Sequence, residues 1–195
     1  MKINAKKEIS NFKICFLADK HGLFDDRIYW KMAVPLMESG FDVYYILIGS
    51  ENRKGITKEG VKFEKIQVKS FFKNRYLNFG IKRLNPLNNY KKLLKVAANI
   101  NADVYHIHDL WLNRIGNKIK NLPHKPILFY DAREPYVQDY RSIPGRNIGE
   151  YALNYLFSFY VDFWEMRMAK NCDLIISNED NVRDRFRDEY GDHKS

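Results

Sequence analysis

The stretch from Ala102 to Asp109 limits the fold of this chain most, because a short apolar run ends there in ionisable residues. Its residues Val104, Tyr105 and Ile107 are β-branched or aromatic, which is typical of a buried strand, and helical patterns precede and follow it. His108 and Asp109 come where that strand would end. Ligands of open α/β sheets bind at the carboxyl ends of the strands, so these two residues are candidates for chemistry.

A second stretch, Ile127 to Glu134, repeats this arrangement. It also runs from apolar residues into charged ones, here Asp131, Arg133 and Glu134. Two strands that each end in ionisable groups predict one shared cleft at the same edge of a sheet.

The first 50 residues predict how that sheet is built. Lys13–Ala18 and Asp42–Ile48 have the pattern of strands, and a helix is predicted between them. Asp26 would cap this helix, Pro35 would kink it and Gly40 would end it. Such a βαβ unit implies parallel strands with a right-handed crossover. The loop after the first strand lacks the glycine pattern of a dinucleotide site, and no P-loop motif occurs in the chain.

The remaining elements extend this α/β pattern. We expect strands at 61–68, as one strand or a pair, and at 174–177, and helices at 86–100, 112–120, 150–169 and 181–190. The segment 133–149 is predicted to be irregular. Seven of the fourteen residues from Tyr151 to Trp164 are aromatic, so that helix is either buried on two sides or docks a partner.

Length and composition indicate one domain, 13–191, after a frayed segment, 1–12. The chain has 195 residues, of which 45% are apolar. Cys15 and Cys172 lie in predicted strands and are expected to be buried thiols, without a metal site. No signal peptide and no membrane-spanning run is recognisable, so we expect a cytoplasmic protein.

The net charge of +9 is concentrated in one segment. Between Lys65 and Ala102 there are nine Lys or Arg and no acidic residue, and charges elsewhere balance. Aromatic residues are interleaved with these cations, so an anionic membrane surface is one expected partner. Four cations would contact that surface: Lys73, Arg75, Lys82 and Arg83. A solvated face and a nucleic-acid site are the alternatives, and the second is disfavoured because no RNA- or DNA-binding motif is present.

Four motifs in order resemble the N-terminal half of a GT-B glycosyltransferase, especially the retaining family 4-like enzymes of bacterial surface-polysaccharide pathways. They are Phe24–Ile28 leading into Leu36–Val43, then Ala102–Asp109, then Tyr130–Glu134, and finally Glu165 with Ala169–Ser177. The resemblance covers about residues 13 to 190. It implies a Rossmann-like parallel sheet with helices on both faces.

The resemblance also implies a function. In that family the N-terminal domain mostly binds the acceptor, the C-terminal domain binds the nucleotide-sugar donor, and no metal or other cofactor is usually needed. The expected partners are therefore a saccharide or lipid-linked acceptor and a donor-binding domain, in cis or in trans. We expect that donor-binding domain to be absent from this chain, so the chain alone would be inactive. Lipid-linked acceptors would place the protein peripherally at the inner membrane face.

Residues at the predicted cleft receive roles on this basis. His108 and Asp109 are the candidate catalytic residues, although Asp109 could instead cap the next helix. His106 lies on the same face of the strand and is expected in the core. Candidate acceptor-binding residues follow the first and fifth strands: His21, Gly22, Asp25, Asp131, Arg133 and Glu134.

One of these residues departs from the family pattern. Arg133 occupies a position where the family has histidine, and arginine stays protonated at neutral pH. It can clamp a phosphate or carboxylate, so the change either alters acceptor recognition or marks lost activity. A non-catalytic binding subunit of a split transferase is therefore the alternative function. Asp131 and Glu134 would hold sugar hydroxyls or simply pair with Arg133.

Overall fold

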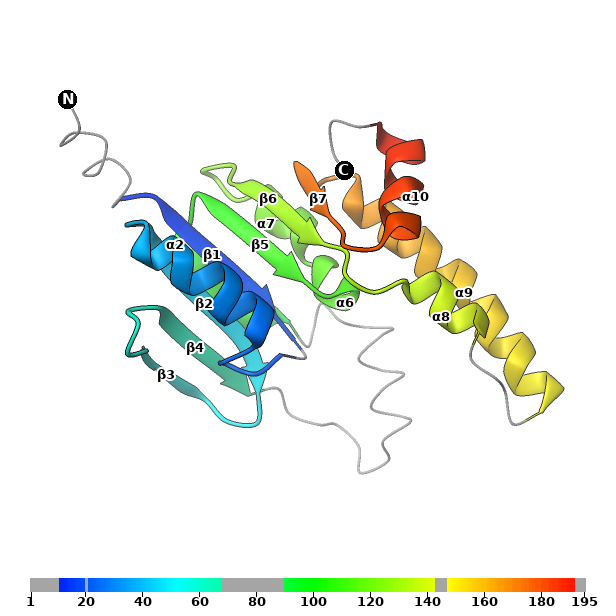
Figure 1. The fold of residues 1–195 in the computed structure, drawn as a ribbon, viewed down its shortest axis with the longest axis horizontal. Helices are drawn as coiled ribbons and strands as arrows, with labels where there is room; N and C mark the ends of the chain where they lie inside the picture. The colour runs from blue at the N-terminus through cyan, green and yellow to red at the C-terminus, as the bar shows by residue number, and fades with distance from the viewer. Residues whose placement is uncertain (1–10, 20, 68–89, 143–146, 192–195) are drawn as a thin grey trace.

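The computed structural model describes residues 11–19, 21–67, 90–142 and 147–191. In these ranges seven strands form one sheet, in the order β3-β4-β2-β1-β5-β6-β7 (Figure 1). The strands are β1 (Lys13–Ala18), β2 (Asp42–Gly49), β3 (Arg53–Ile56), β4 (Lys62–Gln67), β5 (Val104–His108), β6 (Ile127–Asp131) and β7 (Leu174–Ile176). Every pairing is parallel except that of β3 with β4. The predicted α/β class with a Rossmann-like sheet is confirmed.

Helices cover both faces of this sheet. One face packs against η1 (Asp26–Ala33) and α2 (Val34–Glu38), drawn in blue in Figure 1. The other face packs against α5 (Lys91–Ile100), α7 (Gly116–Lys120), the end of α9 (Ile148–Ala169) and α10 (Asp180–Tyr190). Two shorter helices, α6 (Leu110–Asn113) and α8 (Tyr136–Ser142), lie near the carboxyl ends of the strands.

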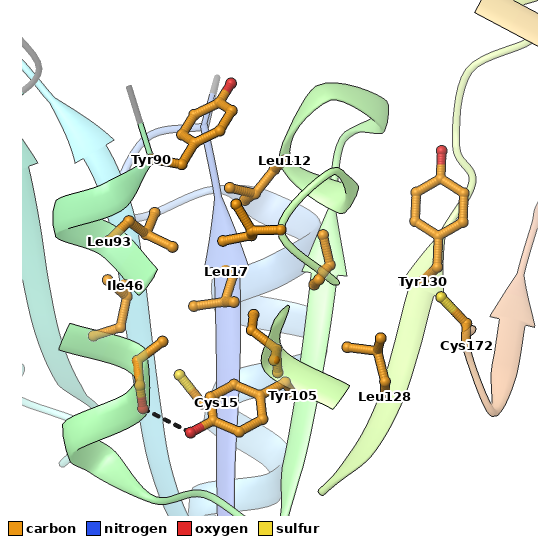
Figure 2. Close-up of a cluster of buried hydrophobic side chains, with 14 of the residues drawn as sticks. Cys15, Leu17, Ile46, Tyr90, Leu93, Tyr105, Leu112, Leu128, Tyr130 and Cys172 are labelled. Carbon is orange, nitrogen blue, oxygen red and sulfur yellow. Dashed lines mark hydrogen bonds between the residues drawn. The ribbon is translucent and has the colours of Figure 1, made fainter. Parts of the chain in front are cut away.

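The larger core lies under α5 and α7 and unites strands from across the sheet (Figure 2). Leu17 and Tyr105 are fully buried there, and the Tyr105 hydroxyl donates to the Ala97 carbonyl oxygen at 2.6 Å. That bond satisfies a phenol which would otherwise be costly to bury. Cys15 and Cys172 are buried free thiols, as expected.

The first helix begins differently from the prediction. Asp25, and not Asp26, is the capping residue, because its carboxylate accepts from the backbone N–H groups of Arg27 and Ile28 at 3.0 and 2.9 Å. Asp26 is the first helical residue and pairs with Lys31. The helix opens with π-type turns and continues as α2, which has Pro35 in its first turn. π-type turns often occur at functional sites.

The edge strand β3 was not predicted. Its residues are all exposed and carry two adjacent cations, so no apolar alternation reveals it, and the charges suit an exposed sheet edge. The predicted helix 112–120 is wrong as a single element, since α6 and α7 are separate. A Cβ on Gly116 would lie 2.8 Å from the Asn113 side-chain oxygen, so this close approach requires glycine.

The segment 133–149 is not wholly irregular either, since α8 forms within it and packs on α9. The long aromatic helix is present as α9, and its N-terminal part extends beyond the arrowheads of β5 and β6 in Figure 1. In the ranges that the structure describes, no helix has the length and apolarity needed to cross a bilayer. The four membrane-contact candidates Lys73, Arg75, Lys82 and Arg83 lie outside those ranges, as does most of the predicted frayed terminus.

Candidate acceptor site

The site lies where β1, β5 and β6 end side by side. The sheet order changes direction between β1 and β5, because β2 lies on one side of β1 and β5 on the other. Loops that follow strands on either side of such a switch point diverge and leave a crevice for ligands. His21 follows β1, Asp109 follows β5, and Asp131 ends β6.

His108 and Asp131 form the buried floor of this site. They are register partners on β5 and β6, and His108 Nδ1 lies 2.9 Å from Asp131 Oδ2. The Arg27 guanidinium donates to the other carboxylate oxygen at 2.7 Å. Burial alone would raise the pKa of Asp131, but the His108 hydrogen bond and the Arg27 charge outweigh it and lower that pKa. Asp131 is therefore ionised, and it pairs with Arg27 and His108, not with Arg133.

A second histidine–carboxylate pair lies beside the first. His21 Nδ1 is 2.9 Å from Asp25 Oδ2, and His21 Nε2 is 3.7 Å from Asp109 Oδ2. Burial would raise the pKa of Asp25, yet the Ile28 N–H and His21 lower it. The two rings of His21 and His108 face each other edge to face, with centroids 6.5 Å apart. Two imidazoles thus converge on one place, each oriented by a carboxylate.

Asp109 has a strained backbone. Its φ is 83° with ψ 133°, a conformation that residues with a side chain rarely adopt. Its side chain does not cap α6, so the alternative capping role is wrong. The carboxylate instead accepts from the Asp19 backbone N–H at 3.4 Å and lies 3.4 Å from the Tyr136 hydroxyl. Strain of this kind persists where surrounding contacts hold a functional group in place.

These groups line one pocket of about 300 Å³, which we call the switch-point pocket. Its lining residues come from the ends of β1, β5 and β6 and from α8: His21, His108, Asp109, Asp131, Arg133, Glu134, Tyr136 and Asp139. Six of the eight predicted site residues therefore lie together. The other two, Gly22 and Asp25, line a neighbouring pocket, although Asp25 joins the first through His21.

Three contributors were missed by the sequence reasoning. Arg27 lies within a motif that carried the resemblance, but nothing in its spacing showed that it would reach Asp131. Tyr136 and Asp139 fell in the segment predicted to be irregular, and a helical reading of 136–142 would have placed both on α8. Arg133 Nε is 3.5 Å from Glu134 Oε1, and both side chains remain about half exposed at the mouth of the pocket.

His106 behaves as the core residue that was expected. It is buried between the Phe16 and Phe129 rings. Burial is the main cause that lowers its pKa to about 3, and the nearby charge of His108 is the second cause. Ligand atoms of His106, His108 and Asp131 lie within 4.8 Å of one another and could hold a metal ion. Arg27 already neutralises the Asp131 carboxylate, however, so we assign hydrogen bonding and not metal binding to this group.

His108 retains an unused nitrogen. Its Nε2 is buried and makes no hydrogen bond to the part of the chain that the structure describes. His108 Nδ1 lies beside Asp131 Oδ2, so a proton on Nδ1 would leave Nε2 as the acceptor nitrogen, which is the tautomer needed to receive a hydroxyl proton. The pocket thus gathers a buried imidazole and several carboxylates, groups that suit a hydroxyl-bearing ligand.

Comparison with known structures identifies the fold. A sucrose-phosphate synthase from Thermosynechococcus elongatus superposes with a TM-score of 0.58 over 92% of this chain and 45% of its own, at 10% identity. A trehalose-6-phosphate protein from E. coli, bound with UDP-2-fluoro glucose, gives a TM-score of 0.53 over 90% of this chain and 42% of its own, also at 10% identity. The chain has the fold of one half of a GT-B glycosyltransferase.

The present chain spans less than half the length of either protein. No protein-family model matches its sequence, and no curated protein matches it significantly. At this identity the likeness establishes the glycosyltransferase-like fold alone.

Proposed function

We propose that this chain is the acceptor-binding half of a glycosyltransferase, which transfers a sugar from a nucleotide-sugar to a saccharide or lipid-linked acceptor. The single observation that carries the proposal is the His108–Asp131 pair in the switch-point pocket. Asp131 holds the imidazole beside the pocket, and acceptor binding would turn the ring so that Nε2, buried in this structure, accepts a hydrogen bond from the acceptor hydroxyl. The fold and the resemblance to family 4-like enzymes of surface-polysaccharide pathways supply the reaction class.

The surrounding residues fit a sugar. Asp109 and Glu134 offer carboxylate oxygens that accept bonds from hydroxyl groups, and Tyr136 adds an aromatic hydroxyl beside them. Burial, and to a lesser extent the negative charge of Asp109, raises the pKa of Tyr136, so the Tyr136 hydroxyl stays a neutral donor. The nucleotide-sugar would be held by a donor-binding domain in cis or in trans, and we assign no other cofactor.

Saccharide binding tests the proposal directly. Backbone amide NMR spectra of the chain would be recorded with a panel of hexoses, N-acetylhexosamines and their lipid-linked diphosphates. We expect at least one compound to shift the resonances of residues 108–109 and 131–136. His108→Gln should weaken that binding about tenfold or more, as expected for a lost hydrogen bond to a polar ligand.

His124→Gln is the matched control, because this histidine contacts the Ala102 carbonyl oxygen and does not line the pocket. Equal weakening by both variants, or a panel that leaves the pocket resonances unmoved, would refute the proposal.

Transfer itself needs both halves of the cleft, because reacting groups must be aligned between them. We expect no turnover of UDP- or GDP-sugars by the 195-residue chain alone, and turnover by this chain would contradict that expectation. A non-catalytic binding subunit is the second candidate, favoured by the exposed Arg133 at the mouth, which cannot act as a base. If a donor-binding partner restores transfer, and His108→Gln abolishes it while leaving acceptor binding measurable, the catalytic assignment holds.

A further inference from the structure

A second pocket of about 490 Å³ lies next to the first, between the loop after β1 and the antiparallel edge of the sheet. We call it the edge pocket. The loop contributes Gly22 to Asp25, and β3 and β4 contribute a set of aromatic, apolar and basic side chains, namely Arg53, Ile56, Phe63 and Lys65, with Thr57 following β3. Asp25 joins this pocket to the switch-point pocket through its contact with His21.

Two cations face each other across the edge strands. Arg53 and Lys65 are register partners in the β3–β4 ladder, and both line the edge pocket. Like charges placed directly opposite each other destabilise a sheet. The next pair of the same ladder shows the ordinary solution, because Lys54 lies opposite Glu64. We therefore expect the Arg53–Lys65 pair to cost stability that a single substitution would remove.

No acidic residue relieves this pair. Within the described ranges, neither Arg53 nor Lys65 forms an ion pair, and the Arg53 guanidinium lies 6.0 Å from the Phe63 ring centroid. Asp25 is the one carboxylate in the lining, and it is engaged by two backbone N–H groups and by His21. The positive charge of the pocket is thus directed at a ligand or at solvent.

An aromatic surface adjoins the two cations. Phe24 is 60% exposed, lines the edge pocket, and stacks beside Trp30, which is 46% exposed. Exposed aromatic faces next to polar groups suit the apolar face of a sugar ring, and an arginine fork suits the two oxygens of a phosphate or carboxylate.

We propose that the edge pocket binds an anionic sugar unit of the acceptor, with Arg53 and Lys65 holding its phosphate or carboxylate and Phe24 contacting its ring. This inference rests on the proposed function and deepens it, because it names the chemical class of the acceptor. The hydroxyl that reacts would lie in the switch-point pocket, and the anionic group would fix the orientation of the acceptor from the adjoining one.

Calorimetric or NMR titration with four defined probes tests this assignment. The probes are glucose 6-phosphate, glucuronic acid, glucose and inorganic phosphate. We expect one of the two anionic sugars to bind more tightly than glucose and inorganic phosphate, and its affinity to fall as salt is raised. A phosphate preference and a carboxylate preference are separated by the first two probes.

Substitutions of the two cations should change both affinity and stability, which substitutions on a merely solvated face would not do. Arg53→Gln with Lys65→Gln should lower the affinity for the anionic sugar at least tenfold, because charge-assisted hydrogen bonds are lost. The same variant should unfold about 1–3 °C higher than the parent, because the repulsion is removed. Lys54→Gln, on the same strand, is the control, and it should leave the affinity unchanged.

Each possible result has a clear reading. Affinity lost together with unchanged or raised stability supports the edge pocket. Equal affinities for parent and double variant overturn it, as does the absence of binding by either anionic sugar. If neutral saccharides still shift residues 108–136 while these results fail, the proposed function survives and only the anionic class is refuted.

Discussion

The switch-point pocket and the edge pocket arrange their charges in opposite ways. In the first, Asp131 is paired with Arg27 and His108, and His21 is paired with Asp25, which lines the second pocket. In the second, Arg53 and Lys65 lie opposite each other without an ion pair to any residue that the structure describes. The first set of charges therefore supports the fold, whereas we expect the second set to lower its stability.

This difference teaches how each pocket should be tested. Removing a buried paired charge of the switch-point pocket, such as Asp131, should damage the fold and the function together, so a loss of activity in that variant proves little by itself. Removing a charge from the edge pocket separates the two, because stability should rise while binding falls. Comparing the two pockets thus separates charges that stabilise the fold from charges that we propose bind a ligand.

The largest effect is expected when the buried carboxylate of the switch-point pocket is removed. Asp131→Ala leaves the Arg27 guanidinium and the His108 imidazole without their common partner. Breaking a buried pair in this way costs about 3–5 kcal/mol. Urea unfolding followed by circular dichroism measures it, and Asp139→Ala, an exposed carboxylate of the same pocket, is the control. A cost below about 1 kcal/mol would show that the charges of the two pockets do not differ as described.

A pH dependence of stability is the next largest effect. Burial holds the pKa of His106 at about 3, against an ordinary value near 6.5. As pH falls through about 6.5, the unfolded state takes up a proton that the folded state refuses, so stability falls between about pH 6.5 and pH 3. At pH 5 the free energy of unfolding should be lower than at neutral pH by about 2 kcal/mol.

The neighbouring groups act in a lower range. The folded pKa of Asp131 and of Asp25 is depressed, so their stabilisation is lost only as pH falls below the ordinary carboxyl value. His106→Phe keeps a flat ring and removes the titration, so unfolding free energy measured from pH 7 to pH 5 should lose most of its slope. An unchanged slope would mean that the dependence has another source.

A smaller effect is expected at Asp109, where the backbone and not the charge is unusual. Glycine normally destabilises a position relative to alanine, but at a φ of 83° it should be the better residue. Asp109→Gly is therefore expected to be more stable than Asp109→Ala by about 1–2 kcal/mol. Both variants lose the carboxylate, so their difference isolates the strain. The reverse order in thermal unfolding would show that the strain is absent in solution.

Much of the fold could be predicted because the parallel strands are apolar and each is followed directly by polar residues. The apolar runs that end at His108 and Asp131 predicted two strands and part of the site from local sequence alone. The edge strand β3 could not be found in this way, since its residues are exposed and its pairing depends on β4. The break between α6 and α7 falls at 114–115, and no sequence pattern there predicts it.

The candidate site was predictable in its members but not in its pairings. Strand ends brought His21, His108 and Asp109 to one edge, as a parallel sheet requires. Arg27 reaches Asp131 from a position 104 residues earlier, and no local pattern specifies that contact. The pairing of Arg53 with Lys65 was unpredictable for a similar reason, because two charges far apart in the sequence become opposite neighbours only through the strand register.

The smallest effect is also the most specific test of that register. Lys65→Glu would place a carboxylate opposite Arg53 and should raise stability by about 0.2–1 kcal/mol, because an opposite-charge pair replaces a like-charge pair. Glu64→Lys makes the reverse change at the neighbouring pair with Lys54, and it should lower stability by a similar amount. Both effects should shrink in 1 M NaCl, since exposed charges are screened. If both substitutions changed stability in the same direction, β3 would not pair with β4 in this register, and the edge pocket would lose the repulsion on which its assignment depends.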